Sequence, residues 1–141
     1  MFKYKLVCFG GTFNGIHAGH ETLIKKAFEV GEFIVIGLTT DSYAGMKFDS
    51  VKKYDERKAA LEDYLNAAGF SGRYDISPLS EPYGITLTNR KLDAIVVSDE
   101  TIRSAMEINR LRRAMGMNEL GIVKIEMVYD KDSKKVSSRN S

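Results

Sequence analysis

The residues best suited to chemistry lie in one short stretch, residues 10–20, which reads Gly-Gly-Thr-Phe-Asn-Gly-Ile-His-Ala-Gly-His. Both histidines of the chain, His17 and His20, fall within it, and Thr12 adds a hydroxyl group. Imidazole N–H groups and hydroxyl groups donate hydrogen bonds to phosphate oxygens. Neighbouring glycines let a ligand approach the main chain closely. This stretch therefore predicts a site that binds phosphate groups.

The elements on either side of the stretch support this interpretation. Residues 4–9 form a short apolar run that is typical of a buried strand. Residues 21–30 have the apolar spacing of a helix whose start lies near Gly19. Free N–H groups and the positive end of the helix dipole stabilise anions at a helix start. A strand, a small-residue turn and a helix start thus follow one another in the order that a phosphate site requires.

The stretch does not match other well-known phosphate or metal motifs. It lacks the Gly-x-x-x-x-Gly-Lys-Ser/Thr pattern of a P-loop and the Gly-x-Gly-x-x-Gly pattern of a dinucleotide site. A zinc site is disfavoured, because no cysteine and few carboxylates lie near the two histidines in sequence. Both histidines could instead only cap or pack the helix start. We expect no metal site formed by protein side chains.

Strand-like and helix-like segments alternate along the whole chain. Five strands are predicted, at 4–9, 33–39, 73–77, 94–98 and 122–128. Helices are predicted at 21–30, 55–68 and 100–115, with Asp55 as a cap of the second. Segments 40–54 and 78–91 are predicted as loops. This alternation favours an α/β fold, a five-stranded parallel sheet with helices on both faces. We expect one domain over 1–141, with a flexible tail over about 129–141.

Composition and charge limit the classes of function. A net charge of +2 gives no argument for nucleic acid, and no apolar run is long enough to cross a membrane. No signal peptide is evident at the N-terminus. The single cysteine, Cys8, cannot form an internal disulfide and is expected to pack in the core. We expect a cytoplasmic protein that binds small molecules, without nucleic acid or membrane partners. A homo-oligomeric state stays open.

Residues 11–13, together with His17-Ala18-Gly19-His20, resemble the His-x-Gly-His signature of the nucleotidyltransferase superfamily, whose members share a Rossmann-like fold. Within it, the chain is most similar to the archaeal-type phosphopantetheine adenylyltransferases. The similarity extends to segments 36–41, 54–57, 82–84, 93–101 and 108–112. It implies transfer of AMP from ATP to 4′-phosphopantetheine, which gives dephospho-coenzyme A and pyrophosphate.

The resemblance also implies roles for the first motif and the loop that follows the second strand. His20 would contact the α-phosphate and the leaving pyrophosphate, and His17 would help to bind the nucleotide phosphates. Thr12 would orient the acceptor phosphate. A loop lysine would bridge the two substrates; Lys47, Lys52 and Lys53 are candidates, and Lys53 is assigned to the catalytic group. The predicted acceptor site comprises Thr12, Lys47, Lys52 and Leu79.

The nucleotide site implied by the resemblance draws on the whole chain. Its residues are Gly10, Gly11, Thr12, Phe13, His17, His20, Ser98, Glu100, Asn109, Arg112, Ser137 and Ser138. The last two match the serines of the family's Ile-Ser-Ser-Thr-Arg-Ile segment. The threonine of that segment is missing here, and the arginine falls one place early.

Magnesium is expected to arrive with ATP and to neutralise its charge, as it does in phosphoryl transfer generally. Two alternatives to the adenylyltransferase remain. One is a related cytidylyl- or adenylyltransferase with another phosphate acceptor. The other is a nucleotide-binding module without turnover, which the altered C-terminal segment would favour.

Overall fold

A parallel five-stranded sheet forms the centre of the molecule, seen in a computed structural model that describes residues 2–46 and 50–126. The strand order is β3-β2-β1-β4-β5, and every neighbouring pair runs parallel. The strands are β1 (Tyr4–Gly11), β2 (Gly31–Thr39), β3 (Tyr74–Leu79), β4 (Ala94–Val97) and β5 (Gly121–Lys124). The helices are α1 (Ala18–Val30), α2 (Asp41–Gly45), α3 (Tyr54–Ala67), α4 (Ile102–Ala114) and the 3₁₀ turn η1 (Gly84–Leu87).

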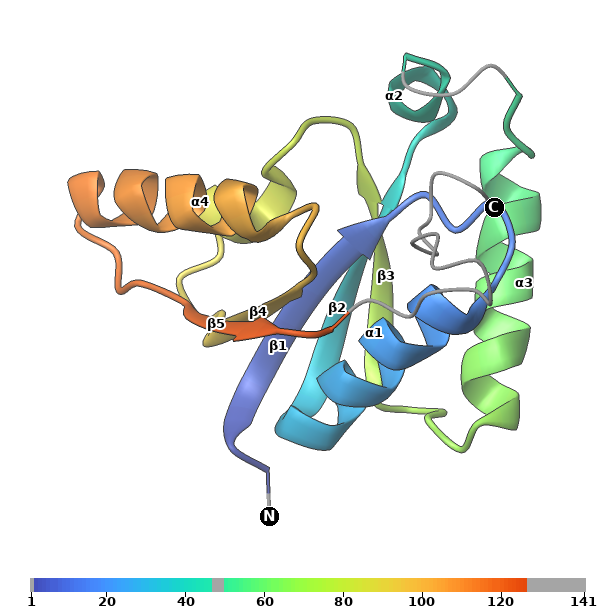
Figure 1. Cartoon of the computed structure of the whole chain (residues 1–141), viewed down its shortest axis with the longest axis horizontal. Helices are drawn as coiled ribbons and strands as arrows, with labels where there is room; N and C mark the ends of the chain where they lie inside the picture. Colours follow the sequence, from blue (N-terminus) through green and yellow to red (C-terminus); the bar gives the residue numbers. More distant parts are fainter. Residues whose placement is uncertain (1, 47–49, 127–141) are drawn as a thin grey trace.

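Helices cover both faces of the sheet, with α1 and α3 on one side and α4 on the other (Figure 1). Alternate residues of β1 serve the two faces, because side chains along a strand point to opposite sides. Val7 and Phe9 pack with α1 and α3, whereas Cys8 packs with Ala105 and Ile108 of α4. The predicted fold class and the presence of helices on both faces are therefore confirmed.

The order of the strands reverses beside β1, the central strand. β2 and β3 extend the sheet on one side of β1, and β4 and β5 extend it on the other. In parallel sheets, ligands bind beyond the carboxyl ends of the strands at such a reversal point. The end of β1, which leads into residues 12–17, therefore lies where a ligand site is expected.

Several element boundaries differ from those predicted. The helix α1 begins at Ala18, earlier than residue 21, because His17 caps it. The residues predicted as a loop after β2 include α2, which Thr40 caps by accepting a hydrogen bond from the Tyr43 N–H. Lys53, and not Asp55, is the N-cap residue of α3. A short η1 turn lies within the predicted irregular segment 78–91.

The C-terminal part of the prediction is only partly tested. Strand β5 begins one residue earlier than predicted, at Gly121, and ends at Lys124. The predicted tail over about 129–141 lies outside the described residues. In the described ranges, no helix combines the length and apolar character needed to cross a membrane.

Candidate active site

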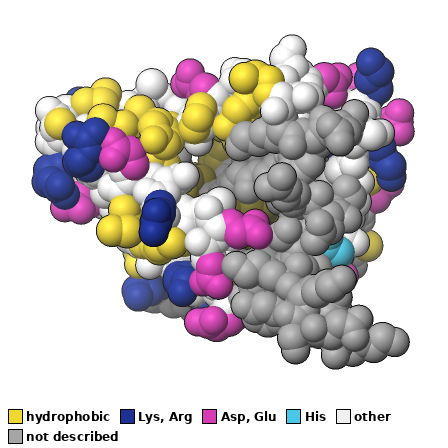
Figure 2. Space-filling view, turned by 45° about the horizontal axis from the view of Figure 1, so that its top comes forward, with side chains coloured by type: hydrophobic (Ala, Val, Ile, Leu, Met, Phe, Trp, Pro, Cys, Tyr) yellow, Lys and Arg dark blue, Asp and Glu magenta, His cyan; other side chains and the backbone are white. Residues whose placement is uncertain are grey.

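A cavity of about 850 Å³ opens at the carboxyl edge of the sheet, beyond the ends of β1 and β4. Figure 2 turns this edge toward the reader and shows the surface hollowed beside α4. The cavity is lined by six predicted nucleotide-binding residues of the first motif: Gly10, Gly11, Thr12, Phe13, His17 and His20. The structure thus brings the whole motif to one place.

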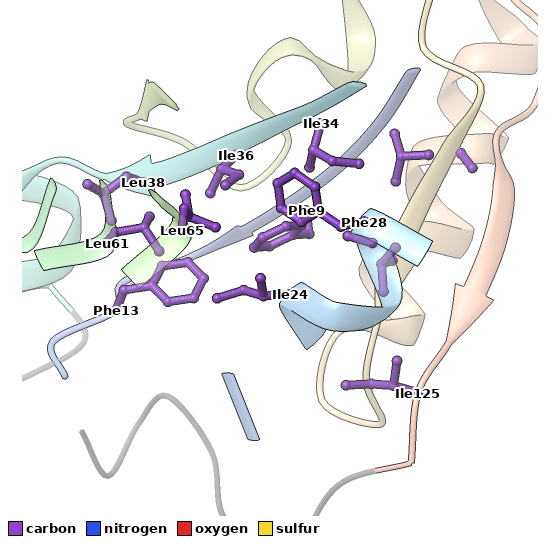
Figure 3. Packing of buried hydrophobic residues seen from close by; sticks show 14 residues of the cluster. Phe9, Phe13, Ile24, Phe28, Ile34, Ile36, Leu38, Leu61, Leu65 and Ile125 are labelled. Carbon is purple, nitrogen blue, oxygen red and sulfur yellow. The ribbon is translucent and has the colours of Figure 1, made fainter. Parts of the chain in front are cut away.

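The turn after β1 depends on an unusual backbone at Phe13. Its φ of 50° lies in the left-handed region, where a bulky residue is strained by roughly 1–3 kcal/mol. The ring is buried and packs against Phe9 and the His20 ring, and Figure 3 shows it beside Ile24 in the core. The Phe13 side chain therefore belongs to the core, while the residue also lines the cavity. Its predicted nucleotide contact stays a prediction.

Glycine is required at position 11 because of space, not because of its backbone angles. A Cβ atom there would lie 2.8 Å from the Phe13 ring, closer than real Cβ contacts. Neither Gly10 nor Gly11 has a positive φ. The left-handed residue that the turn requires is Phe13, which sequence reasoning did not identify.

The two histidines form a capping box at the start of α1. The His17 Nδ1 atom accepts from the Gly19 N–H at 3.1 Å, and the His20 Nδ1 atom accepts from the His17 N–H at 3.3 Å. Their rings are stacked, with centroids 3.8 Å apart and an interplanar angle of 16°. Capping and cavity lining coexist in these residues, so the capping interpretation does not exclude a ligand role.

His20 is held as a neutral hydrogen-bond donor. Burial lowers the pKa of its imidazole to about 3, the neighbouring His17 lowers it further, and the backbone of Gly15 opposes the shift. Because Nδ1 accepts the His17 N–H, the proton of the neutral ring lies on Nε2. Nε2 is buried and has no partner among the described residues. His20 lines the cavity, and its Nε2–H is a buried donor without a protein partner in the described ranges.

Thr12 is paired with a second hydroxyl from the next strand. The Thr39 hydroxyl, at the end of β2, donates to Thr12 Oγ1 at 3.0 Å, and both residues are about 4% exposed. Both also line the cavity. Sequence analysis assigned no role to Thr39.

The opposite wall of the cavity comes from β4 and α4. Ser98 and Glu100 line it as predicted, and the Glu100 N–H donates to the Ser98 hydroxyl at 3.3 Å. Thr101 and Ser104 line it too and were not predicted. The helical period gives the signal that could have found Ser104, because it faces the same way as Ala105 and Ile108 along α4.

Leu79 ends β3 and lines the cavity, in agreement with its predicted place in the acceptor site. It also lines a smaller apolar cavity of about 80 Å³ beneath η1. The two cavities share five lining residues, Gly10, Leu79, Pro82, Ile95 and Ile108. Leu79 thus lies at the boundary between the two cavities.

Two of the three loop lysines, Lys52 and Lys53, are exposed and do not line the cavity. The main chain of Lys52 is held by Asn14 and Arg57, and Lys53 occupies the N-cap position of α3 without a capping hydrogen bond from its side chain. A catalytic contact of Lys53 is therefore not supported by this arrangement. Lys47, Ser137 and Ser138 lie outside the described residues.

Asn109 and Arg112 also lie away from the cavity, contrary to prediction. The Asn109 amide donates to the Leu120 carbonyl at 2.9 Å and accepts from the Leu120 N–H at 2.7 Å. The buried Arg112 guanidinium donates to the carbonyls of Asn118, Thr86 and Asn89. Both side chains bind main-chain groups of the loops around α4. Their match to the family's segment 108–112 is therefore explained by a role in holding the fold together.

Charge in the cavity comes mainly from helix starts. Among the described lining residues, Glu100 is the only Asp, Glu, Lys or Arg. The N-terminus of α1 lies at His17 and that of α4 at Thr101, and both residues line the cavity. Two positive helix ends and the His20 N–H therefore favour an anion there.

Comparison with known proteins agrees with this geometry, that of an α/β protein with a cavity at a strand-to-helix turn. The family model described as cytidylyltransferase-like matches residues 8–140. The phosphopantetheine adenylyltransferase of Methanopyrus kandleri is 44% identical over 139 residues, covering 96% of this chain and 87% of the relative. That of Methanothermobacter thermautotrophicus is 43% identical over 136 residues, covering 96% and 82%.

A solved structure extends the comparison to the fold. A protein of unknown function from Archaeoglobus fulgidus matches with a TM-score of 0.79 and 34% identity, over 94% of this chain and 96% of the other. The chain belongs to the cytidylyltransferase-like family of nucleotidyltransferases and, within it, to the phosphopantetheine adenylyltransferases. The predicted family is confirmed.

Proposed function

We propose that the chain moves AMP from ATP to 4′-phosphopantetheine, giving dephospho-coenzyme A and pyrophosphate. The family and the names of its relatives support this reaction. The observation that carries it is the convergence of a buried, unpartnered His20 N–H and the Thr12 hydroxyl on one cavity. The cytoplasm is the setting that we propose for such a biosynthetic enzyme.

The reaction needs no protein nucleophile. A phosphate oxygen of the acceptor attacks the α-phosphorus of ATP, a new P–O bond forms, and the bond to the pyrophosphate oxygen breaks. Catalysis then rests on positioning and on stabilising charge at the reacting phosphorus. Thr12 orients the acceptor phosphate by donating a hydrogen bond from its hydroxyl group. The smaller cavity beside Leu79 offers apolar surface to an acceptor with an organic arm.

His20 acts in this scheme as a hydrogen-bond donor and not as a proton donor. With its pKa near 3, the ring is neutral at physiological pH and has only the Nε2 proton to offer. A fixed donor in a site that excludes water stabilises charge as it develops on the α-phosphate. The stacked His17 ring holds His20 in place.

Magnesium is proposed to enter with the nucleotide. In the described residues, no group of three or more His, Cys, Asp or Glu side chains is arranged to hold a metal ion. The ion would neutralise triphosphate charge when bound. The protein groups around it would be the helix starts and hydroxyls of the cavity.

The test is a panel of nucleotides and acceptors with pyrophosphate release as the readout. ATP and CTP are each combined with 4′-phosphopantetheine, glycerol 3-phosphate, nicotinamide mononucleotide and FMN. We expect turnover with ATP and 4′-phosphopantetheine. Turnover of CTP with glycerol 3-phosphate alone would overturn the proposed acceptor and base. Tight ATP binding in calorimetry without any pyrophosphate release would instead indicate a module that lacks catalysis.

A further inference from the structure

A single buried arginine joins four segments behind the cavity. Arg57, in the first turn of α3, is 1% exposed. Its Nε donates to the Lys52 carbonyl at 2.8 Å, and Nη1 donates to the Thr12 carbonyl at 2.9 Å and to Thr39 Oγ1 at 3.3 Å. Its Nη2 pairs with Asp41 at 3.1 Å. The guanidinium therefore lies where the carboxyl ends of β1 and β2 meet the start of α3.

The hydrogen bonds from Arg57 reach the Thr12 hydroxyl through Thr39. Arginine can only donate, so the Arg57 guanidinium occupies a lone pair of Thr39 Oγ1. The positive charge also turns the Thr39 proton away from it. Among the described residues, Thr12 Oγ1 is the acceptor that the structure provides for that proton, at 3.0 Å. In the opposite direction Thr39 Oγ1 would accept from both Arg57 and Thr12, and its own proton would have no protein acceptor among the described residues.

The direction of this chain decides what Thr12 can do. Once Thr12 Oγ1 accepts from Thr39, its own proton has no acceptor among the described residues and is left for a group in the cavity. A hydroxyl that donates suits a phosphate oxygen, which only accepts when ionised. Without the relay, the Thr12 hydroxyl could satisfy itself by donating to Thr39 instead.

We propose that Arg57 and Thr39 are positioning residues that fix the Thr12 hydroxyl as a donor toward the acceptor phosphate. This inference rests on the proposed function. It adds a sequence of hydrogen bonds, from Arg57 to Thr39 to Thr12, that ends at the substrate. The same guanidinium also contacts Asp41 and the Lys52 carbonyl, so one residue joins the start of α2 and the start of α3 to the two hydroxyls.

A double-mutant cycle on the two threonines tests the relay. Thr39→Val removes the donor with little change in volume, and Thr39→Ser retains it. We expect Thr39→Val to lower kcat/KM for the acceptor roughly 5- to 20-fold, the effect of one hydrogen bond, while KM for ATP changes less than about twofold. In a Thr12→Val background, Thr39→Val should add less than about a further twofold loss, because the relay has no end point.

An equal effect of Thr39→Val in both backgrounds would overturn the relay, since it would show a merely structural role. So would a Thr39→Ser variant as impaired as Thr39→Val. Thermal unfolding of every variant separates lost stability from lost orientation. The cycle is run with whichever phosphate acceptor the wild-type chain uses. If that acceptor is not 4′-phosphopantetheine, the proposed function is overturned, but the cycle still tests the relay. A chain that neither binds nor turns over any phosphate acceptor would overturn both.

Arg73 supplies the matched control for Arg57. It also donates from its guanidinium to three carbonyls, those of Phe28, Gly31 and Glu32, but it does not line the cavity. We expect Arg73→Lys to lower Tm and leave kcat/KM for the acceptor within about twofold. Arg57→Lys should lower kcat/KM for the acceptor more than that for ATP. An Arg57→Lys variant that changes Tm alone would contradict the proposal.

Discussion

At the scale of single residues, the site depends on which atoms hold protons. His20 offers an N–H because its other ring nitrogen is occupied by a main-chain donor, and Thr12 offers an O–H because its oxygen is occupied by Thr39. Neither property is a matter of residue type alone. Each arises from a neighbour that donates to the acceptor atom of the side chain, and both residues line the same cavity.

Removal of the His20 side chain should affect turnover more than binding. We expect His20→Ala to lower kcat by roughly two to three orders of magnitude, the usual effect of losing one donor to developing charge. KM for ATP should change much less, because the helix starts and hydroxyls remain. Steady-state kinetics of pyrophosphate release measures both quantities. A variant with unchanged kcat would remove His20 from the chemistry.

The buried His20 should also make stability depend on pH. Its pKa is about 3 in the folded chain and 6.5 in the ordinary state, so between these values the unfolded chain binds a proton that the folded chain does not. Stability is therefore retained above pH 6.5 and lost as pH falls. From pH 7 to pH 5 we expect a loss of about 2 kcal/mol from this residue.

Urea unfolding at the two pH values measures this loss, and His20→Asn provides the control, because an amide oxygen can still accept the His17 N–H. The variant should lose about 2 kcal/mol less than the wild type over the same range. Identical pH profiles for the two proteins would show that burial does not keep the imidazole neutral.

At the scale of elements, the long helix α4 has two functions. One side contributes Ser104, Ala105 and Ile108 to the cavity, and Asn109 fixes the chain that leads into β5. A side-chain amide has one donor group and one acceptor oxygen, as a peptide unit does, so Asn109 can bond both the carbonyl and the N–H of Leu120. The sequence pattern around it cannot distinguish this role from a ligand contact.

Substitution of Asn109 separates these two interpretations. We expect Asn109→Ala to lower the free energy of unfolding by about 1–3 kcal/mol, because the Leu120 N–H and carbonyl lose buried partners. KM for ATP should remain within about twofold at a temperature where the variant is folded. Chemical denaturation and steady-state kinetics are the measurements. A raised KM with unchanged stability would restore the predicted nucleotide contact.

Sequence reasoning succeeded where local pattern decides the outcome. The apolar runs of the strands and the spacing of Thr12, His17 and His20 predicted the sheet and the centre of the site. It missed α2, because five residues carry too little periodicity and their position depends on the contact of Asp41 with Arg57. It also missed Arg57 and Thr39 as site residues, since their contacts with each other and with Thr12 span 18 to 45 positions in sequence.

At the scale of the whole molecule, the rate at which the Cys8 thiol is labelled measures how often the chain unfolds. Cys8 is the only cysteine, it lies in the central strand, and burial raises the pKa of its thiol to about 12, although nearby Arg112 acts in the opposite direction. A thiolate is the reactive form, so the folded chain should be inert. We expect labelling by a thiol reagent at pH 8 to be slowed roughly a thousandfold or more relative to the chain in urea.

Saturation with ATP should slow this labelling further, because a ligand that binds only the folded chain lowers the population of the open state. At about 100 times its Kd, the ligand should slow labelling roughly 100-fold. The rate of colour development with an aromatic disulfide reagent measures both effects. Rapid labelling of the native chain would mean that the face covered by α4 opens locally.

The order of the strands has a consequence for synthesis. β1 ends at Gly11, but its neighbour β4 begins only at residue 94 and the cavity wall extends to Ile125. At about 5–20 residues per second, a ribosome leaves one edge of this apolar strand unpaired for several seconds. Exposed strand edges attract other chains. The turn after β1 is therefore synthesised long before the opposite wall of the cavity. During this interval the unpaired edge of β1 must be kept from pairing with other chains.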